Sequence, residues 1–101
     1  MAYSNLDFTL RPMKNKGRME KSIYTREYAA VLRLLKNARE SAGITQVQLA
    51  ERLGQTQSFV SKIERGERRL DIVQLRTILK EFDVSLAKFI EQFESAIEKR
   101  G

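Results

Sequence analysis

Residues 46–65 read QVQLAERLGQTQSFVSKIER, and this stretch predicts two short helices joined by a tight turn. In each half, apolar residues recur at the spacing that gives a helix one buried side. These residues are Leu49, Ala50 and Leu53 in the first half and Val60 and Ile63 in the second. Between the halves, Gly54 can take the positive φ that a sharp turn between helices requires. The stretch therefore predicts two crossing helices that pack on each other through their apolar sides.

The second of these helices has a polar outward side. Its polar residues are one, three and four positions apart, so they project away from Val60 and Ile63. They are Gln57, Ser58, Ser61, Lys62 and Arg65, and none of them is acidic. Amides, hydroxyls and a lysine can pair with base edges in a major groove, and an arginine at the helix end can reach a phosphate. A solvated helix can also be polar on one side, but the adjacent turn favours a helix-turn-helix that reads DNA.

The composition fits one small basic domain. The chain has 101 residues, and its 19 Lys and Arg against 13 Asp and Glu give a formal charge of +6. Such a charge favours an anionic partner, either nucleic acid or an acidic membrane surface. No apolar run approaches the roughly 20 residues that a membrane span needs, and the N-terminus lacks the apolar core of a secretion signal. We therefore expect a soluble, cytoplasmic protein without a membrane partner.

The residue types leave little for catalysis. The chain has no Cys and no His, so it lacks disulfides, the usual zinc ligands and the commonest general base. It also lacks a glycine-rich phosphate loop, and its carboxylates are scattered over the expected helix surfaces. We therefore predict no catalytic residues, no metal site, no cofactor and no enzymatic activity.

Periodicity and capping residues predict five helices in residues 25–101, which makes the domain all-α. The expected helices span Thr25–Ala42, residues 46–53 and residues 57–65, and two more follow Asp71 and begin at Ser85. Thr45 with Gln48, and Asp71 with Gln74, have the spacing of capping boxes. The fourth helix is expected to bury Ile72, Leu75, Ile78, Leu79 and Phe82.

Residues 1–24 form an N-terminal extension that departs from the helical pattern. Apolar and polar residues alternate from Leu6 to Leu10, which predicts a short strand that ends at Pro12. The stretch that follows is basic, with Lys14, Lys16, Arg18 and Lys21. The extension is either a poorly ordered tail with solvated charge, or an arm that contacts phosphates or pairs with its copy in a dimer.

Several of these motifs together resemble the phage repressor and Cro-like helix-turn-helix family, often called the XRE family. The resemblance rests on residues 43–46, Leu49-Ala50, Gly54, residues 56–66 and residues 75–85, and it covers roughly residues 28–93. It implies a lambda-repressor-like domain of five helices, in which the second and third helices form the DNA-reading pair. It also implies a dimer that binds a palindromic operator in double-stranded DNA.

The resemblance implies roles for individual residues. Gln46 looks like the family residue that binds a phosphate and steadies the first residue of the reading helix. Arg39 and Glu64 match a family pair, which we interpret as a partly buried ion pair that fixes the angle of that helix, with a direct DNA contact by Arg39 as the alternative. The candidate DNA-binding residues are Gln46, Thr56, Gln57, Ser58, Ser61, Lys62, Arg65, Arg68 and Arg69.

Two positions depart from the family pattern. Asp83 stands where many relatives have glycine at the end of the fourth helix, so we expect a strained or different turn there. Lys62 replaces the amide found in some phage repressors, and a lysine favours guanine O6 and N7 or a phosphate. The DNA sequence that is read therefore cannot be transferred from those repressors.

The fifth helix has an apolar stripe longer than a small core needs. The stripe consists of Leu86, Phe89, Ile90, Phe93 and Ile97. We predict a homodimer interface at Phe89, Phe93 and Ile97, and the alternative is a terminal helix folded fully onto its own domain.

These observations predict a sequence-specific DNA-binding transcriptional regulator, of the repressor or controller kind. The alternative is a DNA-binding antitoxin, to which a toxin protein binds at the N-terminal extension or the fifth helix. A protein-interaction module that no longer reads DNA fits less well, because the outward side of the reading helix carries Gln57 and Lys62.

Overall fold

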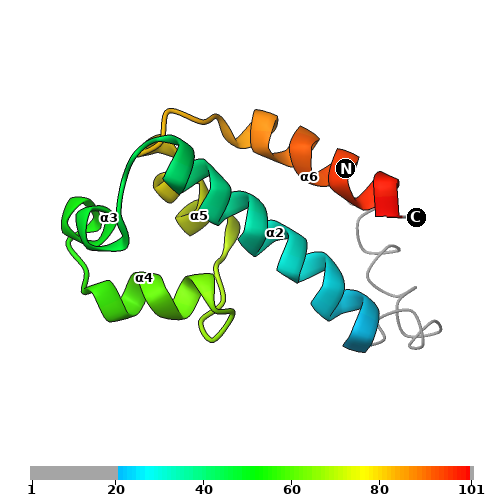
Figure 1. The fold of residues 1–101 in the computed structure, drawn as a ribbon, viewed down its shortest axis with the longest axis horizontal. Helices are drawn as coiled ribbons and strands as arrows, with labels where there is room; N and C mark the ends of the chain where they lie inside the picture. Colours follow the sequence, from blue (N-terminus) through cyan, green and yellow to red (C-terminus); the bar gives the residue numbers. More distant parts are fainter. Residues whose placement is uncertain (1–20, 101) are drawn as a thin grey trace, which may run out of the picture.

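The computed structural model describes residues 21–100 as a bundle of helices, with no strand among them. The helices are α2 (Lys21–Ser41), α3 (Gln46–Leu53), α4 (Gln57–Glu64), α5 (Ile72–Lys80) and α6 (Leu86–Arg100) (Figure 1). The prediction of an all-α, five-helix domain is confirmed. The first helix begins at Lys21, earlier than the expected Thr25. The strand predicted from Leu6 to Leu10 lies outside the described residues.

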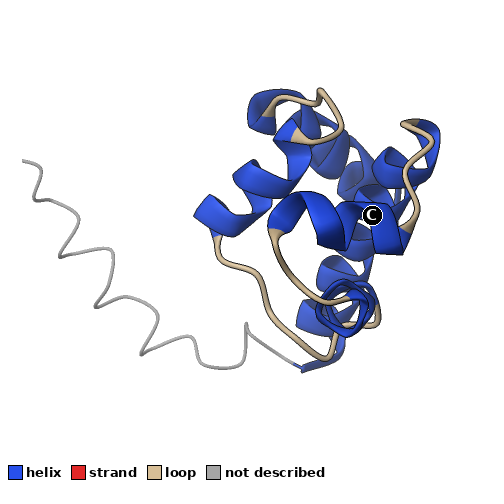
Figure 2. Cartoon of the chain, turned by 90° about the vertical axis from the view of Figure 1, so that its left-hand side faces the viewer, coloured by secondary structure: helices blue, strands red, loops and turns tan. Residues whose placement is uncertain are grey.

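α2 lies between α6 on one side and the pair of α3 and α4 on the other (Figure 1). α3 packs on α4, and α2 packs on both α4 and α6. In Figure 1 the long α2 crosses the molecule, with α6 along one side and α4 on the other. Figure 2, seen from the end where α3 and α4 lie, shows only helices and connecting loops in the described residues. This arrangement leaves one side of α4 open to solvent.

Apolar side chains from all five helices and from the loops between them close a single core. Its buried members are Leu35, Ile44, Leu49, Ala50, Val60, Ile63, Ile78, Leu79, Phe82 and Phe89. They include four of the five residues that spacing had placed on the apolar sides of the central pair, Leu49, Ala50, Val60 and Ile63, and the fifth, Leu53, is half-buried against the core. Full burial of one such large aliphatic side chain stabilises the fold by about 1.5–3 kcal/mol. The core thus fixes how α4 sits on α3 and α2.

Side-chain caps define where the short helices begin. Thr45 Oγ1 accepts from the Gln48 backbone N–H at 3.0 Å, and Gln48 Oε1 accepts from the Thr45 N–H at 2.9 Å. Thr56 caps α4 by accepting from the Phe59 N–H at 3.1 Å. Gly54, with φ of +67°, ends α3 in the left-handed conformation. The predicted caps and the predicted turn at Gly54 are confirmed. The end of α3 at Gly54 and the cap at Thr56 together determine where α4 begins.

The prediction that Ile72 is buried is wrong, because this residue is 61% exposed. Ile72 is the first residue of α5, at the end of the helix away from the buried Ile78 and Leu79. At the other end of α5, Asp83 takes a φ of +61°, and the Val84 N–H closes the turn on Leu79 O at 3.1 Å. The turn therefore keeps the left-handed geometry that glycine would provide, with an aspartate in its place.

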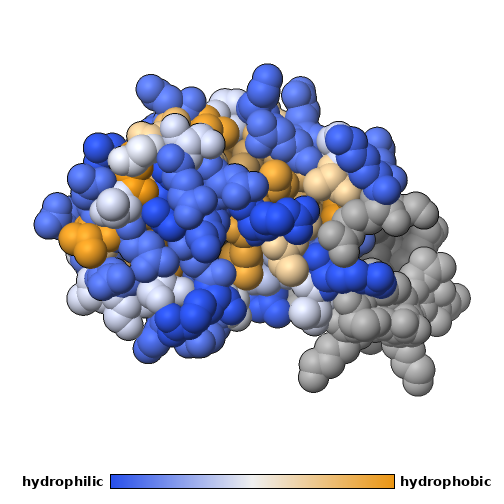
Figure 3. All heavy atoms as spheres, in the orientation of Figure 1, coloured by the Kyte–Doolittle hydropathy of each residue, from blue (hydrophilic) through white to orange (hydrophobic). Residues whose placement is uncertain are grey.

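The surface is mostly hydrophilic in the view of Figure 3, with separate hydrophobic patches. The exposed large hydrophobic residues of the described chain are Val47, Ile72, Val73 and Ile90. No helix within residues 21–100 has the length and apolar content required to cross a membrane.

Candidate nucleic-acid interface

The outward side of α4 consists of Gln57, Ser58, Ser61, Lys62 and Arg65. All are exposed except Ser61, which is half-buried. On the opposite side of the helix, Val60 and Ile63 are each 2% exposed. The helical period and the core therefore leave these polar side chains facing solvent together, as the sequence pattern predicts.

A buried ion pair holds α4 against the end of α2. Arg39 Nε donates to Glu64 Oε2 at 2.6 Å, and Arg39 Nη2 donates to Glu64 Oε1 at 3.1 Å. The third nitrogen, Nη1, donates to the carbonyl oxygen of Ile44 at 2.8 Å. The two side chains are only 8% and 7% exposed, and the hydrogen bond to Glu64 raises the pKa of Arg39 above its ordinary value. Each guanidinium nitrogen thus has a partner inside the protein, which supports the structural interpretation of this pair.

The buried pair continues into a polar chain that ends on the outward side of α4. Gln46 Nε2 donates to Glu64 Oε1 at 2.9 Å, and Gln57 Nε2 donates to Gln46 Oε1 at 3.1 Å. Glu64 therefore orients the Gln46 amide, and Gln46 orients the Gln57 amide in turn. Gln57 keeps its own Oε1 and one N–H for another partner. We call Arg39, Glu64, Gln46 and Gln57 the polar chain.

The far end of the outward side carries an acid that the sequence pattern had missed. Arg65 Nε and Nη2 donate to the two carboxylate oxygens of Glu67 at 2.9 and 3.1 Å, and Nη1 donates to Ser61 Oγ. Hydrogen bonding to Arg65 holds the pKa of Glu67 below its ordinary value, and the charges of Arg65 and Lys62 act in the same direction. None of the five outward residues is acidic, as the sequence shows, but Glu67 from beyond the end of α4 brings a carboxylate to the edge of this surface.

A glycine turn explains how Glu67 reaches the outward side. Gly66 takes a φ of +81°, and the Glu67 N–H donates to Lys62 O at 2.8 Å. The chain thus folds back over the last turn of α4, which brings a residue beyond the helix next to its surface. A glycine just after a helix, followed by an acid, is the signal that could have predicted this contact.

The two loop arginines lie on aromatic rings. The guanidinium carbon of Arg68 is 4.7 Å from the centre of the Phe59 ring, and that of Arg69 is 4.5 Å from the centre of the Tyr28 ring. A stacked guanidinium is held in place while its N–H groups point outward in its own plane. Tyr28 lies on α2, far from this loop in the sequence, so helical spacing gives no sign of its contact with Arg69. Phe59 and Tyr28 thus orient residues of the candidate interface.

The predicted dimer residues do not form one exposed surface. Phe89 is 1% exposed within the core of its own domain, so its assignment to a dimer interface is corrected. Phe93 and Ile97 are half-buried, and Ile90 is the most exposed member of the stripe at 39%. The first turns of α6 therefore close the domain, and only the later part of the stripe is open to a second copy.

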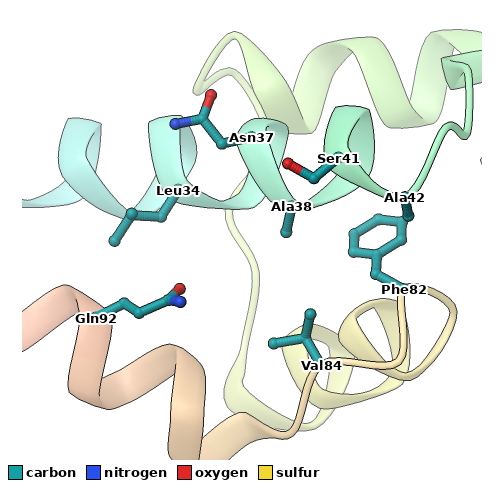
Figure 4. Close-up of a pocket in the computed structure, with 8 residues that line it drawn as sticks. All are labelled: Leu34, Asn37, Ala38, Ser41, Ala42, Phe82, Val84 and Gln92. Atoms are coloured by element: carbon teal, nitrogen blue, oxygen red, sulfur yellow. The ribbon is translucent and has the colours of Figure 1, made fainter.

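A cleft of about 420 Å³ lies between α2 and the α5–α6 region. Its lining consists of Leu34, Asn37, Ala38, Ser41, Ala42, Phe82, Val84 and Gln92 (Figure 4). None of these side chains is titratable, and none belongs to the outward side of α4 or to the polar chain. The cleft is therefore separate from the candidate interface.

Comparisons with known proteins agree with this geometry. Residues 35–89 match a family described as helix-turn-helix. Among solved structures, the chain is similar to an XRE-family like protein from Pseudomonas syringae pv. tomato str. DC3000. The two share 42% sequence identity with a TM-score of 0.70, over 75% of this chain and 93% of that chain. A comparison with curated proteins found no significant match.

Proposed function

The chain belongs to the helix-turn-helix proteins of the XRE family, and from this premise we propose that it is a sequence-specific transcriptional regulator. It binds double-stranded DNA through the outward side of α4, as a repressor or controller protein. Two copies bind the two halves of a palindromic operator. The observation that carries this proposal is the polar chain, because it fixes Gln57 at the start of α4 with one acceptor and one donor still available.

Gln57 is the residue suited to read a base. An adenine presents an N6 donor and an N7 acceptor in the major groove, and a glutamine amide can bind both at once. Because Gln46 takes one N–H of Gln57, the remaining Oε1 and N–H match that adenine pattern. Lys62, further along the outward side, suits guanine O6 and N7 or a phosphate.

Backbone contacts come from the residues around this reading surface. Gln46 retains a second N–H on Nε2 that can reach a phosphate, and Thr56 retains its hydroxyl proton. Arg68 and Arg69 extend the basic surface along the loop after α4, in positions set by their aromatic rings. Such contacts fix the position of a protein on DNA without reading its sequence.

The dimer is proposed to form through the later part of α6. Ile90 is 39% exposed, and Phe93 and Ile97 are incompletely covered by their own domain. A two-fold axis there would place two copies of α4 on half-sites about one helical turn of DNA apart. A Phe93→Asp variant should be monomeric in sedimentation, and it should lose much more affinity for the full operator than for a half-site.

A DNA-binding antitoxin is the second candidate, and the exposed start of α5 favours it. This surface differs from the N-terminal extension and the fifth expected helix, α6, where the sequence placed a toxin. Ile72 and Val73 are 61% and 69% exposed, beside a shallow groove that Phe59 and Leu70 help to line. An apolar surface of this kind suits a protein partner. Co-purification of the chain with the product of a neighbouring gene would support this candidate.

Selection from a random DNA pool tests the main proposal. We expect enrichment of a palindrome whose half-sites contain an adenine that becomes dispensable in a Gln57→Ala variant. That variant should lose about 1–3 kcal/mol of binding free energy on the selected site and should remain folded. A pool without enrichment, or a Gln57→Ala variant with unchanged base preference, would refute the assignment.

A further inference from the structure

Arg65 and Glu67 lie where α4 ends, at the edge of its outward side. All three guanidinium nitrogens of Arg65 have partners within the protein, two on Glu67 and one on Ser61. Arg65 was expected to bind a DNA phosphate. Nη1 and Nη2 each keep one further N–H, but the Nε–Nη2 edge, which can bind two oxygens side by side, is occupied by Glu67. A two-bond phosphate contact through that edge therefore requires the exchange of Glu67 for the phosphate.

The pair imitates a contact between arginine and phosphate. A guanidinium binds carboxylates and phosphates alike, through two parallel N–H···O bonds. The two oxygens of Glu67, at 2.9 and 3.1 Å from Nε and Nη2, therefore take the positions that two phosphate oxygens would occupy. The side chains are 54% and 53% exposed, so an incoming phosphate has access to the pair. Exposed pairs of this kind are held weakly against water and salt.

The backbone keeps the carboxylate in this position. Gly66 turns the chain with a φ of +81°, and the Glu67 N–H is bound to Lys62 O at 2.8 Å. The charge of Lys62 also acts on Glu67, so the carboxylate lies near two cations of the outward side. One negative charge thus reduces the positive potential that the end of α4 presents to DNA.

We infer that Glu67 competes with DNA phosphates for Arg65 and thereby weakens binding to unrelated DNA. The inference rests on the proposed DNA-binding function. On unrelated DNA, only phosphate contacts hold the complex together. There the Glu67 carboxylate retains Arg65 and repels the phosphates of the DNA backbone. At the operator, base contacts by Gln57 and Lys62 bring α4 deeper into the groove, and a phosphate then replaces the carboxylate. Glu67 is a specificity-determining residue, although it reads no base itself.

The test compares the full-length protein with its Glu67→Gln variant on the selected operator and on an unrelated duplex. The glutamine keeps the size of the side chain and removes its charge. At about 100 mM salt, the variant should bind unrelated DNA about 3- to 10-fold more tightly, and its log–log salt slope should steepen by about 0.9 for one added phosphate contact. Affinity for the operator should rise less, so the ratio of specific to unrelated binding falls.

Two controls separate this effect from a general change in charge. Glu91→Gln makes the same charge change at an exposed position on α6, and α2 lies between α6 and α4 (Figure 1). It should leave the salt slope unchanged. In an Arg65→Gln background, Glu67→Gln should steepen the slope far less, because the arginine that it releases is missing. Thermal unfolding of each variant verifies that the fold is retained.

Three results would overturn the inference about Glu67. Weaker operator binding by Glu67→Gln with an unchanged slope would overturn the inference and would mean that Glu67 positions Arg65 for a DNA contact. Equal gains from Glu67→Gln and Glu91→Gln would also overturn it, since net charge alone would then account for the effect. If the unmodified protein binds neither duplex, the proposed function itself fails, and the inference fails with it.

Discussion

Glu64 and Arg65 are neighbours in the sequence, yet their ion pairs lie in opposite environments. Glu64 points inward to Arg39, and the two side chains are 7% and 8% exposed. Arg65 points outward to Glu67, and those two side chains are 54% and 53% exposed. Both pairs are forks with two hydrogen bonds between guanidinium and carboxylate. The difference shows that burial, and not chemistry, decides whether such a pair is part of the scaffold or an exchangeable contact.

Solvent explains why the two pairs behave differently. Loss of one member of the buried pair leaves the other charged and without water, which is strongly unfavourable. Loss of one member of the exposed pair leaves a charge that water solvates at once. The buried pair therefore suits the task of holding Gln46 and Gln57 in place. The exposed pair suits a surface whose partners change when DNA arrives.

Glu64→Ala is the change with the largest expected effect. It leaves Arg39 buried without its carboxylate and should lower the free energy of unfolding by about 3–5 kcal/mol. Glu67→Ala, its counterpart in the exposed pair, should change the unfolding midpoint very little. Urea unfolding followed by circular dichroism measures both. A similar loss in the two variants would contradict the distinction between the pairs.

Gln46→Ala cuts the polar chain between Glu64 and Gln57. The buried pair remains, so stability should change by less than about 0.5–1 kcal/mol. Gln57 loses the partner that orients its amide, and binding to the operator should weaken by about 1–3 kcal/mol, with relaxed preference at the base that Gln57 reads. Affinities for the operator and its single-base variants test this. Unchanged base preference would show that Gln57 needs no orientation by Gln46.

Gly66→Ala disturbs the turn that brings Glu67 to Arg65. The position has a φ of +81°, and a Cβ there would lie 3.2 Å from Leu32 Cδ1. We expect a loss of about 1–2 kcal/mol in stability from the left-handed backbone alone. Gly54→Ala is the matched control, because it has a φ of +67° and no heavy atom within 4 Å of the added carbon. A larger loss at Gly66 than at Gly54 measures the contact with Leu32, and equal losses would show that Leu32 moves aside.

The sequence predicts the central helices and their caps well because the signals are local. Thr45 with Gln48, Thr56 and Gly54 act within a few residues, and the structure has each of them in its expected role. The burial of Ile72 was predicted wrongly because periodicity defines a side of a helix, but not how far the neighbouring helices cover it. Phe89 shows the same limit in the opposite direction, since it belongs to the core of its own domain.

The interface was harder to predict than the fold because its contacts join distant segments. Spacing alone could not connect Gln46 with Glu64 or Gln57, and only the family resemblance suggested that Gln46 steadies the reading helix. Glu67 was missed because it lies beyond the end of α4 and returns to its surface through the turn at Gly66. Helical periodicity does not extend across such a turn.

The smallest expected effect is a change in the titration of Glu67, and it sharpens the comparison without disturbing the fold. Hydrogen bonding to Arg65, and then the charge of Arg65, hold the pKa of Glu67 below its ordinary value. A carboxyl whose pKa is depressed by folding stabilises the folded state above its unfolded pKa, and this contribution is lost as the pH falls through the folded pKa. In an Arg65→Gln variant the pKa of Glu67 should rise toward its ordinary value, and in Lys62→Gln it should rise less, because the charge of Lys62 is the smaller cause. Carbon-detected NMR of the side-chain carboxyl groups measures both shifts. A pKa of Glu67 that does not respond to Arg65→Gln would mean that the exposed pair is not formed in solution. Of the two pairs, only the buried one between Arg39 and Glu64 would then exist, and Arg65 would be a solvated charge.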